Sequence, residues 1–220
     1  MSASQILAIV FVAVAAYLFG SLNSAIIVCK IIKHDDIRKY GSKNAGLTNV
    51  LRVYGKSTAA ITLLCDLFKG IFAVTAARLI VGNLFEIYYF GENMFIGYVA
   101  GLAVVLGHIF PIYYGFRGGK GVLTACTTMI AIDPLSMSIA LLVFIIIVAI
   151  SRYVSLGSIT AAVAYPIATA ITQTLRGTDG VLVHTVLAIA LSAFVIAMHH
   201  ANIVRLIKGT ENKLSFKKNH

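Results

Sequence analysis

Long apolar runs are the feature that most constrains what this chain can fold into. A helix of about 20 apolar residues crosses the roughly 30 Å hydrocarbon core of a bilayer. Five runs reach or approach that length: 6–32, 57–81, 94–114, 155–175 and 181–206. Hydrophobic residues make up 59% of the 220 residues and charged residues only 12%, against roughly 25% charged in soluble domains. The sequence therefore predicts an all-α, polytopic membrane helical bundle, with residues 1–220 as a single domain.

The segment between the third and fourth runs holds two shorter apolar stretches, 122–132 and 135–150, separated by Asp133 and Pro134. Proline disfavours helix at the residue before it, so this dipeptide predicts a turn. Two short helices here give seven transmembrane helices in total, whereas a re-entrant hairpin gives five. Both counts are odd, so both place the two chain termini on opposite sides of the membrane.

Positive charge is divided unevenly between the two sides of this predicted bundle. Fifteen of the 18 Lys and Arg residues fall on one side, including seven in segment 30–56 and five in the tail, Lys217 and Lys218 among them. The connection 82–93, on the other side, has no Lys or Arg. Cytoplasmic loops carry the excess of cations, so we expect a cytoplasmic C-terminus and an outside N-terminus. The same rule, with anionic lipid, accounts for the net charge of +10 without a nucleic acid partner.

The cysteine and histidine pattern argues against a metal centre. Cys29, Cys65 and Cys126 each lie in an apolar run, and no cluster of residues has metal-ligand spacing. An odd number of cysteines without paired spacing also argues against a disulfide. We expect all three to pack in the core, with no metal and no cofactor.

Four polar, glycine-rich segments interrupt the apolar pattern, and all four map to the predicted cytoplasmic side. They are 20–24, 36–52, 107–121, and the pair formed by 151–158 and 199–205. Polar segments are expensive in lipid unless they line a protein interior or a cavity. Their convergence predicts one site at the cytoplasmic face.

The segment 36–52 has the composition of an anion-binding loop. Hydroxyl, amide and backbone donors come from Ser42, Asn44, Gly46, Thr48 and Asn49. Arg52 follows them and can bind phosphate in a bidentate manner. The alternative interpretation is a solvated loop rich in turn residues.

The segment 107–121 ends in a glycine-rich turn with Arg117 and Lys120. Gly118, Gly119 and Gly121 allow the backbone to approach a ligand closely and to present N–H groups. It is no Walker A loop, because glycine follows the lysine where Ser or Thr is required. At a helix start, however, the helix N-terminus and the lysine act on the same anion. The alternative is a flexible turn whose lysine fixes the topology.

Further polar residues lie inside or near the ends of the predicted helices. His108 and His199 fall near inner helix ends, and Asn202 shares a helix face with His199 at i+3. Asp66 and Lys69, also at i+3, lie well inside the second run. Buried charges in lipid pair with each other, so we interpret these two as a structural ion pair.

Together the segments resemble the bacterial acyl-phosphate:glycerol-3-phosphate acyltransferase family (PlsY), and the matches follow the family's order over nearly the whole chain. The matching stretches are 20–23, 36–38, 41–44, 48–52, Asp66 with 69–70, 107–111, 118–121, 151–158 and 199–211. Small departures are Ala45, where many members have proline, and His200, where arginine is common.

The resemblance implies transfer of a fatty acyl group from acyl phosphate to the 1-hydroxyl of glycerol 3-phosphate, the first acylation step of phospholipid biosynthesis. It implies seven helices with an outside N-terminus in the bacterial inner membrane, no metal, no covalent acyl-enzyme, and a functional link to the enzyme that makes acyl phosphate. The expected catalytic residues are Arg52, Lys120, Ser158, His199 and Asn202. The expected substrate-binding residues are Ser21, Asn23, Ser42, Asn44, Gly46, Thr48, Asn49, His108, Gly118, Gly119, Gly121 and Ser155.

Two other classes of function fit parts of the pattern. A membrane transporter of a small phosphorylated solute would share the helices and basic lining, but transporters gather polar groups near the midplane in repeat-related broken helices. A non-catalytic lipid-binding scaffold would account for the basic surface but not for the glycine-rich segments. For an acyltransferase, the chain lacks both the Gly-x-Ser-x-Gly elbow and the His-x-x-x-x-Asp motif, which favours an activated donor such as acyl phosphate.

Overall fold

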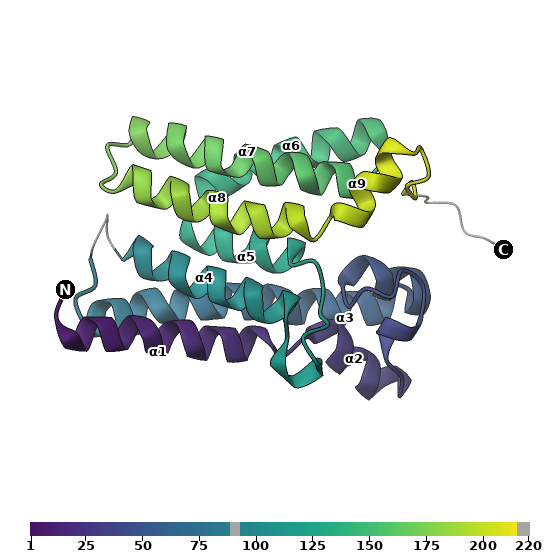
Figure 1. Ribbon diagram of the computed structural model, residues 1–220, viewed down its shortest axis with the longest axis horizontal. Helices are drawn as coiled ribbons and strands as arrows, with labels where there is room; N and C mark the ends of the chain where they lie inside the picture. Colours follow the sequence, from purple (N-terminus) through teal and green to yellow (C-terminus); the bar gives the residue numbers. More distant parts are fainter. Residues whose placement is uncertain (89–92, 215–220) are drawn as a thin grey trace. The chain divides into compact units, whose positions relative to one another are not determined.

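The computed structural model describes residues 1–88 and 93–214, and every regular element in these ranges is a helix (Figure 1). The chain divides into two compact units, Met1–Ile132 and Asp133–His220. The first unit contains α1 to α5 and the second contains α6 to α9. Lys217 and Lys218, which contribute to the charge bias, lie outside the described residues.

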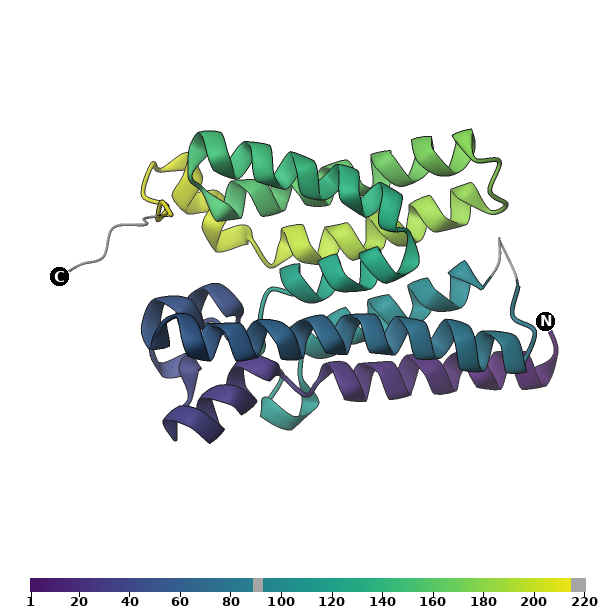
Figure 2. The same cartoon turned by 180° about the vertical axis from the view of Figure 1, so that it is seen from behind.

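The first unit is built on three long helices. Its elements are α1 (Ala3–Gly20), α2 (Ser24–Lys33), η1 (Ile37–Lys39), α3 (Leu47–Ala76), η2 (Ala77–Gly82), α4 (Met94–Ile109), η3 (Ile112–Tyr114) and α5 (Val122–Ile132). α1 packs chiefly on α4, and α3 on α5; Figure 2 shows α3 lying along α1. Gly20 permits the close crossing of α1 and α4, because a Cβ there would lie only 2.8 Å from the Cα of Val104.

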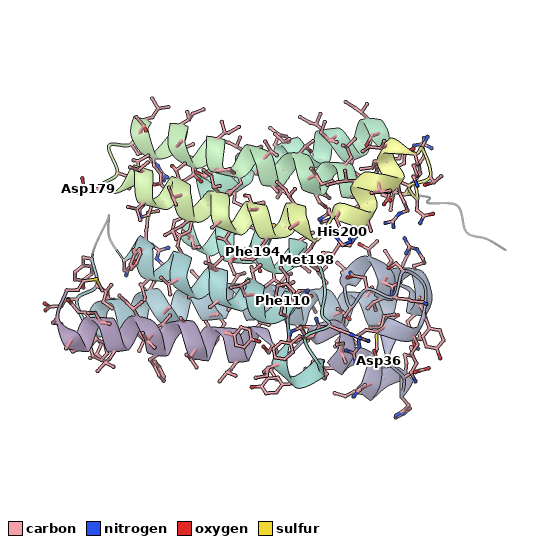
Figure 3. All side chains as sticks on the ribbon, in the orientation of Figure 1. Asp36, Phe110, Asp179, Phe194, Met198 and His200 are labelled. Atoms are coloured by element: carbon pink, nitrogen blue, oxygen red, sulfur yellow. The ribbon has the colours of Figure 1, made fainter. Side chains whose placement is uncertain are left out.

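The second unit is a smaller antiparallel bundle. It contains α6 (Pro134–Ser151), α7 (Val154–Leu175), α8 (Val181–Ala197) and α9 (His200–Ile207). α7 packs against both α6 and α8. Figure 3 shows Asp179 in the connection between α7 and α8, and His200 at the opposite end of α8. The polar starts of α7 and α9 therefore share one end of this unit.

The all-helical membrane character expected from the sequence is confirmed. Within the described residues, five helices are long and apolar enough to cross a membrane, or six if α8 and α9 form one bent span. α5 has 11 residues and a length of about 17 Å, too short to cross the hydrocarbon core. The part of the chain that the structure describes thus holds five or six candidate spans and one shorter apolar helix, α5.

Two predicted helices are broken in the structure, and a third has a separate helical turn before it. The run 6–32 is two helices, because the Asn23 side chain accepts from the Ile26 N–H at 3.1 Å and starts α2 afresh. The second run was expected to begin at residue 57, and this agrees with the backbone: α3 starts at Leu47 but is interrupted at Gly55, whose φ of 78° is non-helical, so the unbroken helix begins just after that glycine. The run 181–206 is bent by 61° between α8 and α9. At that bend the His199 ring donates from Nδ1 to the Val195 carbonyl at 2.7 Å.

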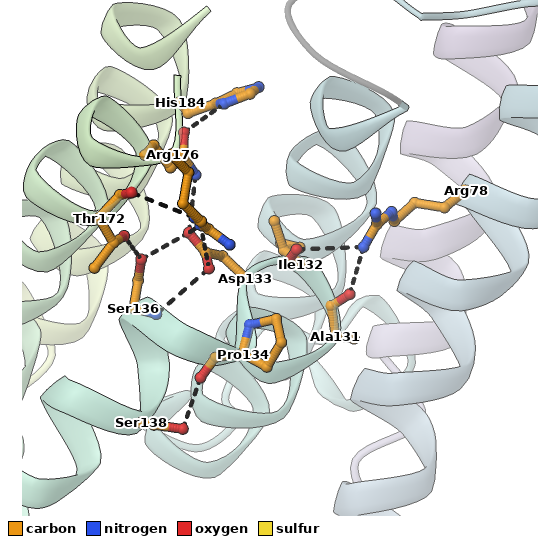
Figure 4. A network of polar contacts seen from close by, with 11 residues as sticks. Arg78, Ala131, Ile132, Asp133, Pro134, Ser136, Ser138, Thr172, Arg176 and His184 are labelled. Carbon is orange, nitrogen blue, oxygen red and sulfur yellow. Dashed lines mark hydrogen bonds and ion pairs between the residues drawn. The ribbon is translucent and has the colours of Figure 1, made fainter. Parts of the chain in front are cut away.

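The predicted turn at Asp133 and Pro134 is confirmed, and helix ends on both sides of it are held by arginines (Figure 4). In the first unit, Arg78 donates to the Ala131 carbonyl at 2.7 Å, near the C-terminus of α5. In the second unit, Asp133 caps α6 and pairs with Arg176 at 2.9 Å. A cation near a helix C-terminus and a carboxylate at an N-terminus both complement the helix dipole. These two arginines, which stand outside the cytoplasmic charge excess, thus have structural partners.

Candidate active site

A buried polar cluster lies where α1 breaks into α2. We define it as Ser24, Asp66, Lys69 and His108, all at most 5% exposed. Ser24 donates its hydroxyl to Asp66 Oδ1 at 2.7 Å. Lys69 Nζ lies 3.2 Å from Asp66 Oδ1 and 3.2 Å from His108 Nδ1. The expected ion pair between Asp66 and Lys69 is therefore present, and it includes a histidine.

The same charges stabilise the helix break. Lys69 Nζ also donates to the carbonyls of Gly20 and Leu22 at 3.3 Å each, at the C-terminal end of α1. Asp66 receives its hydrogen bond from the first residue of α2. The cation thus faces a helix C-terminus and the anion faces a helix N-terminus, as the two dipoles favour. An ion pair inside α3 consequently fixes the polar segment 20–24 in place.

The glycine-rich turn is tied to the end of α4. Gly118 donates its N–H to the Ile109 carbonyl and Gly119 donates to the His108 carbonyl, both at 3.1 Å. Those two N–H groups are therefore engaged within the chain and do not face a ligand, contrary to our expectation for these glycines. The missing side chain of Gly119 instead lets the turn pack closely against the preceding loop, because a Cβ there would lie 2.6 Å from the Ala45 carbonyl oxygen. Gly121, with φ of 75°, then leads directly into α5.

Arg38 clamps this turn to the preceding loop, and our sequence analysis did not select it. Its guanidinium donates to the carbonyls of Tyr114 at 2.8 Å and Arg117 at 3.1 Å, and pairs with Asp36 at 2.7 Å. Hydrogen bonding from Arg38 lowers the pKa of Asp36 below its ordinary value, against the opposing effect of burial. The sequence signal that could have led us to select Arg38 is the Asp-x-Arg pattern at 36–38, which formed part of the family resemblance.

Asn49 organises the other loop of the site. Its amide donates to the carbonyls of Tyr40 and Asn44 at 3.0 and 3.1 Å, and its Oδ1 accepts from the Ser42 N–H at 2.9 Å. The side chain is 1% exposed. Asn49 therefore shapes the loop that carries the other donors, and its polar atoms are occupied by the chain itself.

The remaining expected residues of the first unit divide into buried and accessible groups. Ser21 is buried and donates to the Tyr17 carbonyl at 2.8 Å, and Asn23 is buried with its amide 3.4 Å from the Ala45 carbonyl. Gly46 is the N-cap of α3. The accessible side chains are those of Ser42, Thr48 and Arg52, which are exposed, and of Asn44 and Lys120, which are half-buried. A scaffold of buried polar groups thus supports a set of accessible donors and cations.

Glu211 gathers the polar residues of the second unit, and it too was absent from our selected residues. Ser155 donates to it at 3.0 Å, Asn202 at 2.7 Å and Arg205 at 2.7 Å. Burial acts to raise the pKa of Glu211, but the hydrogen bonds from Asn202, Arg205 and Ser155 outweigh it and the net pKa is lowered. The carboxylate therefore joins the start of α7 to α9 through a tail that folds back onto them.

Ser158 and His199 are also buried in this unit, and each bonds to a carbonyl four residues earlier in the chain. Ser158 donates to the Val154 carbonyl at 2.9 Å, and His199 donates to the carbonyl of Val195, one turn before the bend. Ser155 and Asn202 meet through Glu211.

The three cysteines differ in how deeply they are buried. Cys29 is buried as expected and Cys126 is half-buried, but Cys65 is exposed on α3, so the expectation of core packing is wrong for Cys65. Among residues 1–88 and 93–214, no three His, Cys, Asp or Glu side chains are grouped to hold a metal ion. The chemistry available is that of cations, amides and hydroxyls beside loops of fixed shape, which suits anionic ligands.

Comparison with known proteins identifies what this arrangement is similar to. The family profile described as glycerol-3-phosphate acyltransferase matches residues 10–209. A glycerol-3-phosphate acyltransferase of Clostridioides difficile (strain 630) is 43% identical over 218 residues, which cover 97% of this chain and 99% of the relative. One from Chlorobaculum tepidum is 41% identical over 224 residues, with 92% and 95% covered.

Solved structures give the same answer for the fold. A crystal structure of PlsY (YgiH), an integral membrane glycerol 3-phosphate acyltransferase, in its glycerol 3-phosphate form superposes with a TM-score of 0.78 at 33% identity. The match covers 94% of this chain and 96% of that one. The lysophosphatidic acid form of the same protein gives a TM-score of 0.76 at 32% identity, with 94% and 95% covered.

Proposed function

The chain belongs to the glycerol-3-phosphate acyltransferase family, and on that premise we propose that it transfers a fatty acyl group from acyl phosphate to the 1-hydroxyl of glycerol 3-phosphate. The products are lysophosphatidic acid and inorganic phosphate. The observation that carries the proposal is the family match over residues 10–209, together with cations beside two loops of fixed shape.

Two observations support acyl phosphate as the donor: the chain lacks the common acyltransferase motifs, and it has cations suited to binding phosphate. It has neither a nucleophile elbow nor a histidine–aspartate acyltransferase motif. A mixed anhydride already contains a good leaving group, so the protein has chiefly to bring two anions together and offset their repulsion. Arg52 and Lys120 are the cations to which we assign the phosphate groups, with Ser42, Asn44 and Thr48 as further donors.

The transfer is a single substitution at the acyl carbon. The glycerol 1-hydroxyl oxygen forms a bond to the carbonyl carbon, the bond from that carbon to the bridging anhydride oxygen breaks, and phosphate departs with that oxygen and both electrons. The departing phosphate accepts the hydroxyl proton, so no side chain has to act as the base. The cations stabilise the negative charge that moves onto phosphate in the transition state.

Residues of the second unit orient the acceptor and the acyl carbonyl in this proposal. Ser155, Ser158, His199 and Asn202 are the residues we assign to that role. Glu211 holds Ser155 and Asn202 at the start of α7 and in α9, and so acts as their support. The acyl chain remains along apolar helix faces and enters laterally from the bilayer.

For the topology, we propose seven membrane-inserted helices in the bacterial inner membrane, with α5 as the short one. The N-terminus is outside, and the active site and C-terminus are at the cytoplasmic face. The charge distribution supports this orientation, since the loops 34–46 and 110–121 carry cations and the connection 82–93 has none. Membrane lipid and the enzyme that supplies acyl phosphate are the expected partners.

A donor comparison tests the proposal. Purified protein in detergent is given glycerol 3-phosphate with a long-chain acyl phosphate or with the CoA thioester of the same acyl chain. We expect lysophosphatidic acid from acyl phosphate and at most a trace from the thioester. Robust turnover with the thioester alone would refute the choice of donor.

Direct transfer is tested with a protein in which Cys29, Cys65 and Cys126 are all replaced by alanine. We expect turnover to persist, with some stability lost at the buried position Cys29. Intact-protein mass spectrometry after mixing with acyl phosphate alone should show no added acyl group. An acylated protein that passes its acyl group to added glycerol 3-phosphate would contradict direct transfer and would name the nucleophile.

A further inference from the structure

We propose that Lys69 is a positioning residue for acyl transfer, because it holds the His108 ring with its proton on Nε2 and so directs one N–H donor at the phosphate bound beside the 118–121 turn. The inference rests on the proposed function for the identity of the ligand. It assigns a role beyond ion pairing to the charges inside α3.

The tautomer follows from the donors that surround the ring. A lysine ammonium has three N–H donors and no acceptor. Its Nζ lies 3.2 Å from His108 Nδ1, so Nδ1 accepts and the ring proton resides on Nε2. An acceptor for an Nδ1 proton would be Asp66 Oδ1, at 3.7 Å. The ammonium is closer, and Asp66 at 3.2 Å from Nζ keeps it in place.

The other end of the ring lies against the glycine-rich turn. A Cβ on Gly119 would come closer to His108 Nε2 than real Cβ atoms approach their neighbours, so the ring edge touches this residue directly. The main chain of His108 binds the same residue, through the Gly119 N–H at 3.1 Å. Lys120 follows immediately, two residues before α5 begins. The Nε2–H therefore emerges where a lysine and a helix N-terminus both favour an anion.

A purely structural ion pair would not need this histidine. Lys69 Nζ has four acceptors for its three N–H donors: Asp66 Oδ1 and His108 Nδ1 at 3.2 Å each, and the carbonyls of Gly20 and Leu22 at 3.3 Å each. The two carbonyls share one donor, and the histidine nitrogen is among the two nearer acceptors. The contact between Lys69 and Nδ1 orients the His108 ring. Metal sites and catalytic triads also fix a histidine ring through a hydrogen bond at its second nitrogen.

The first test is nitrogen NMR of the protein labelled with 15N-histidine in detergent, with His108→Gln identifying the His108 signals. In the wild type we expect a protonated Nε2 and an unprotonated Nδ1, and the Nε2 signal should shift when inorganic phosphate is added. In Lys69→Met we expect Nδ1 to carry a proton, since Asp66 becomes its nearest partner. A proton on Nδ1 in the wild type, or an Nε2 signal that phosphate leaves unmoved, would overturn the proposal. These readings need no turnover, so they stand apart from any failure of the acyl transfer assay.

The second test is a double-mutant cycle measured as kcat/KM for glycerol 3-phosphate. His108→Phe keeps a ring of similar size and removes both ring nitrogens, so Lys69 has no tautomer left to fix. Lys69→Met should lower kcat/KM by at least about 10-fold beside His108, the scale of a hydrogen bond to a charged group. Beside His108→Phe the same change should cost about twofold or less, a coupling well above the error of such cycles. Equal losses in both backgrounds would reduce Lys69 to a structural role, and unfolding midpoints of all four proteins report whether each remains folded.

Discussion

Gly119→Ala tests whether the geometry at the glycine-rich turn controls activity. Gly119 has no positive φ, so alanine fits its backbone and the effect arises from the added methyl group alone. That methyl group would lie between the His108 ring and the Ala45 carbonyl oxygen, at 2.6 Å from the latter. Ordinary contacts of a Cβ begin at 3.4 Å, so the ring, the turn or the loop has to move.

The size of that movement sets the expected effect. Restoring ordinary contacts requires a displacement of about 1 Å, and a misplacement of that size in a catalytic site costs about 10²-fold in rate. Overpacking of this kind also lowers the free energy of unfolding by about 1–3 kcal/mol. We therefore expect an intact, somewhat less stable protein with activity reduced by about two orders of magnitude.

Gly115→Ala is the matched control in the same turn. Gly115 has φ of 65° and no atom within 4 Å of the position a Cβ would take. Alanine in that left-handed conformation costs about 1–2 kcal/mol in strain, similar to the overpacking cost, but it places nothing in the site. Lysophosphatidic acid formation is measured for both variants well below their unfolding midpoints. Comparable activity in the two would refute the reasoning, because loss of stability alone would then explain both.

Three further outcomes follow from the site and the topology. Lys120→Ala should lower activity by at least about 10²-fold, as expected for losing one preorganised charge-stabilising group, with the unfolding midpoint little changed; near-normal activity would leave Lys120 with a topological role only. A cysteine placed at Lys43, in a protein lacking the native cysteines, should be protected from an impermeant thiol reagent in intact cells and should react after lysis; labelling in intact cells would invert the orientation. The lowered pKa of Glu211 means that its carboxylate stabilises the fold above its ordinary pKa of 4.5, and that this stabilisation is lost as the pH falls through the folded-state pKa. The unfolding midpoint of Glu211→Gln should therefore lie below that of the wild type at pH 7, where the hydrogen bonds from Asn202 and Arg205 are charge-assisted. The gap should narrow as the pH falls below the ordinary pKa of glutamate, and a gap that stays constant through the acid range would contradict the assignment.

The membrane helices were predictable because hydropathy is a local property of the chain. The run 155–175 matches α7, and 135–150 matches α6, to within one residue at each end. The break between α1 and α2 was not predictable in the same way. Its cause is an asparagine that caps α2 and a lysine on α3 that binds the carbonyls at the end of α1. Composition over a window does not register contacts between residues nearly 50 positions apart.

The sequence identified polar residues of the candidate site, but it did not show which way their side chains point. Ser21, Asn23 and Asn49 stand in the segments that the sequence marked, yet their side chains are buried and bond to carbonyls of helix ends and loops. Glu211 and Arg38 were passed over because each acts on groups distant in sequence, Glu211 through the returning tail and Arg38 through the carbonyls of Tyr114 and Arg117. Residue type indicates where polar chemistry gathers, and only packing decides which groups remain for a ligand.

The central claim, acyl transfer from acyl phosphate to glycerol 3-phosphate, is tested most directly by measuring both products in one reaction. Purified protein in detergent receives both substrates, then each substrate alone, and lysophosphatidic acid and inorganic phosphate are followed over time. We expect the two products to appear in equal amounts, and only when both substrates are present. Phosphate release without glycerol 3-phosphate at the same rate, or no lysophosphatidic acid from the folded protein, would contradict the claim.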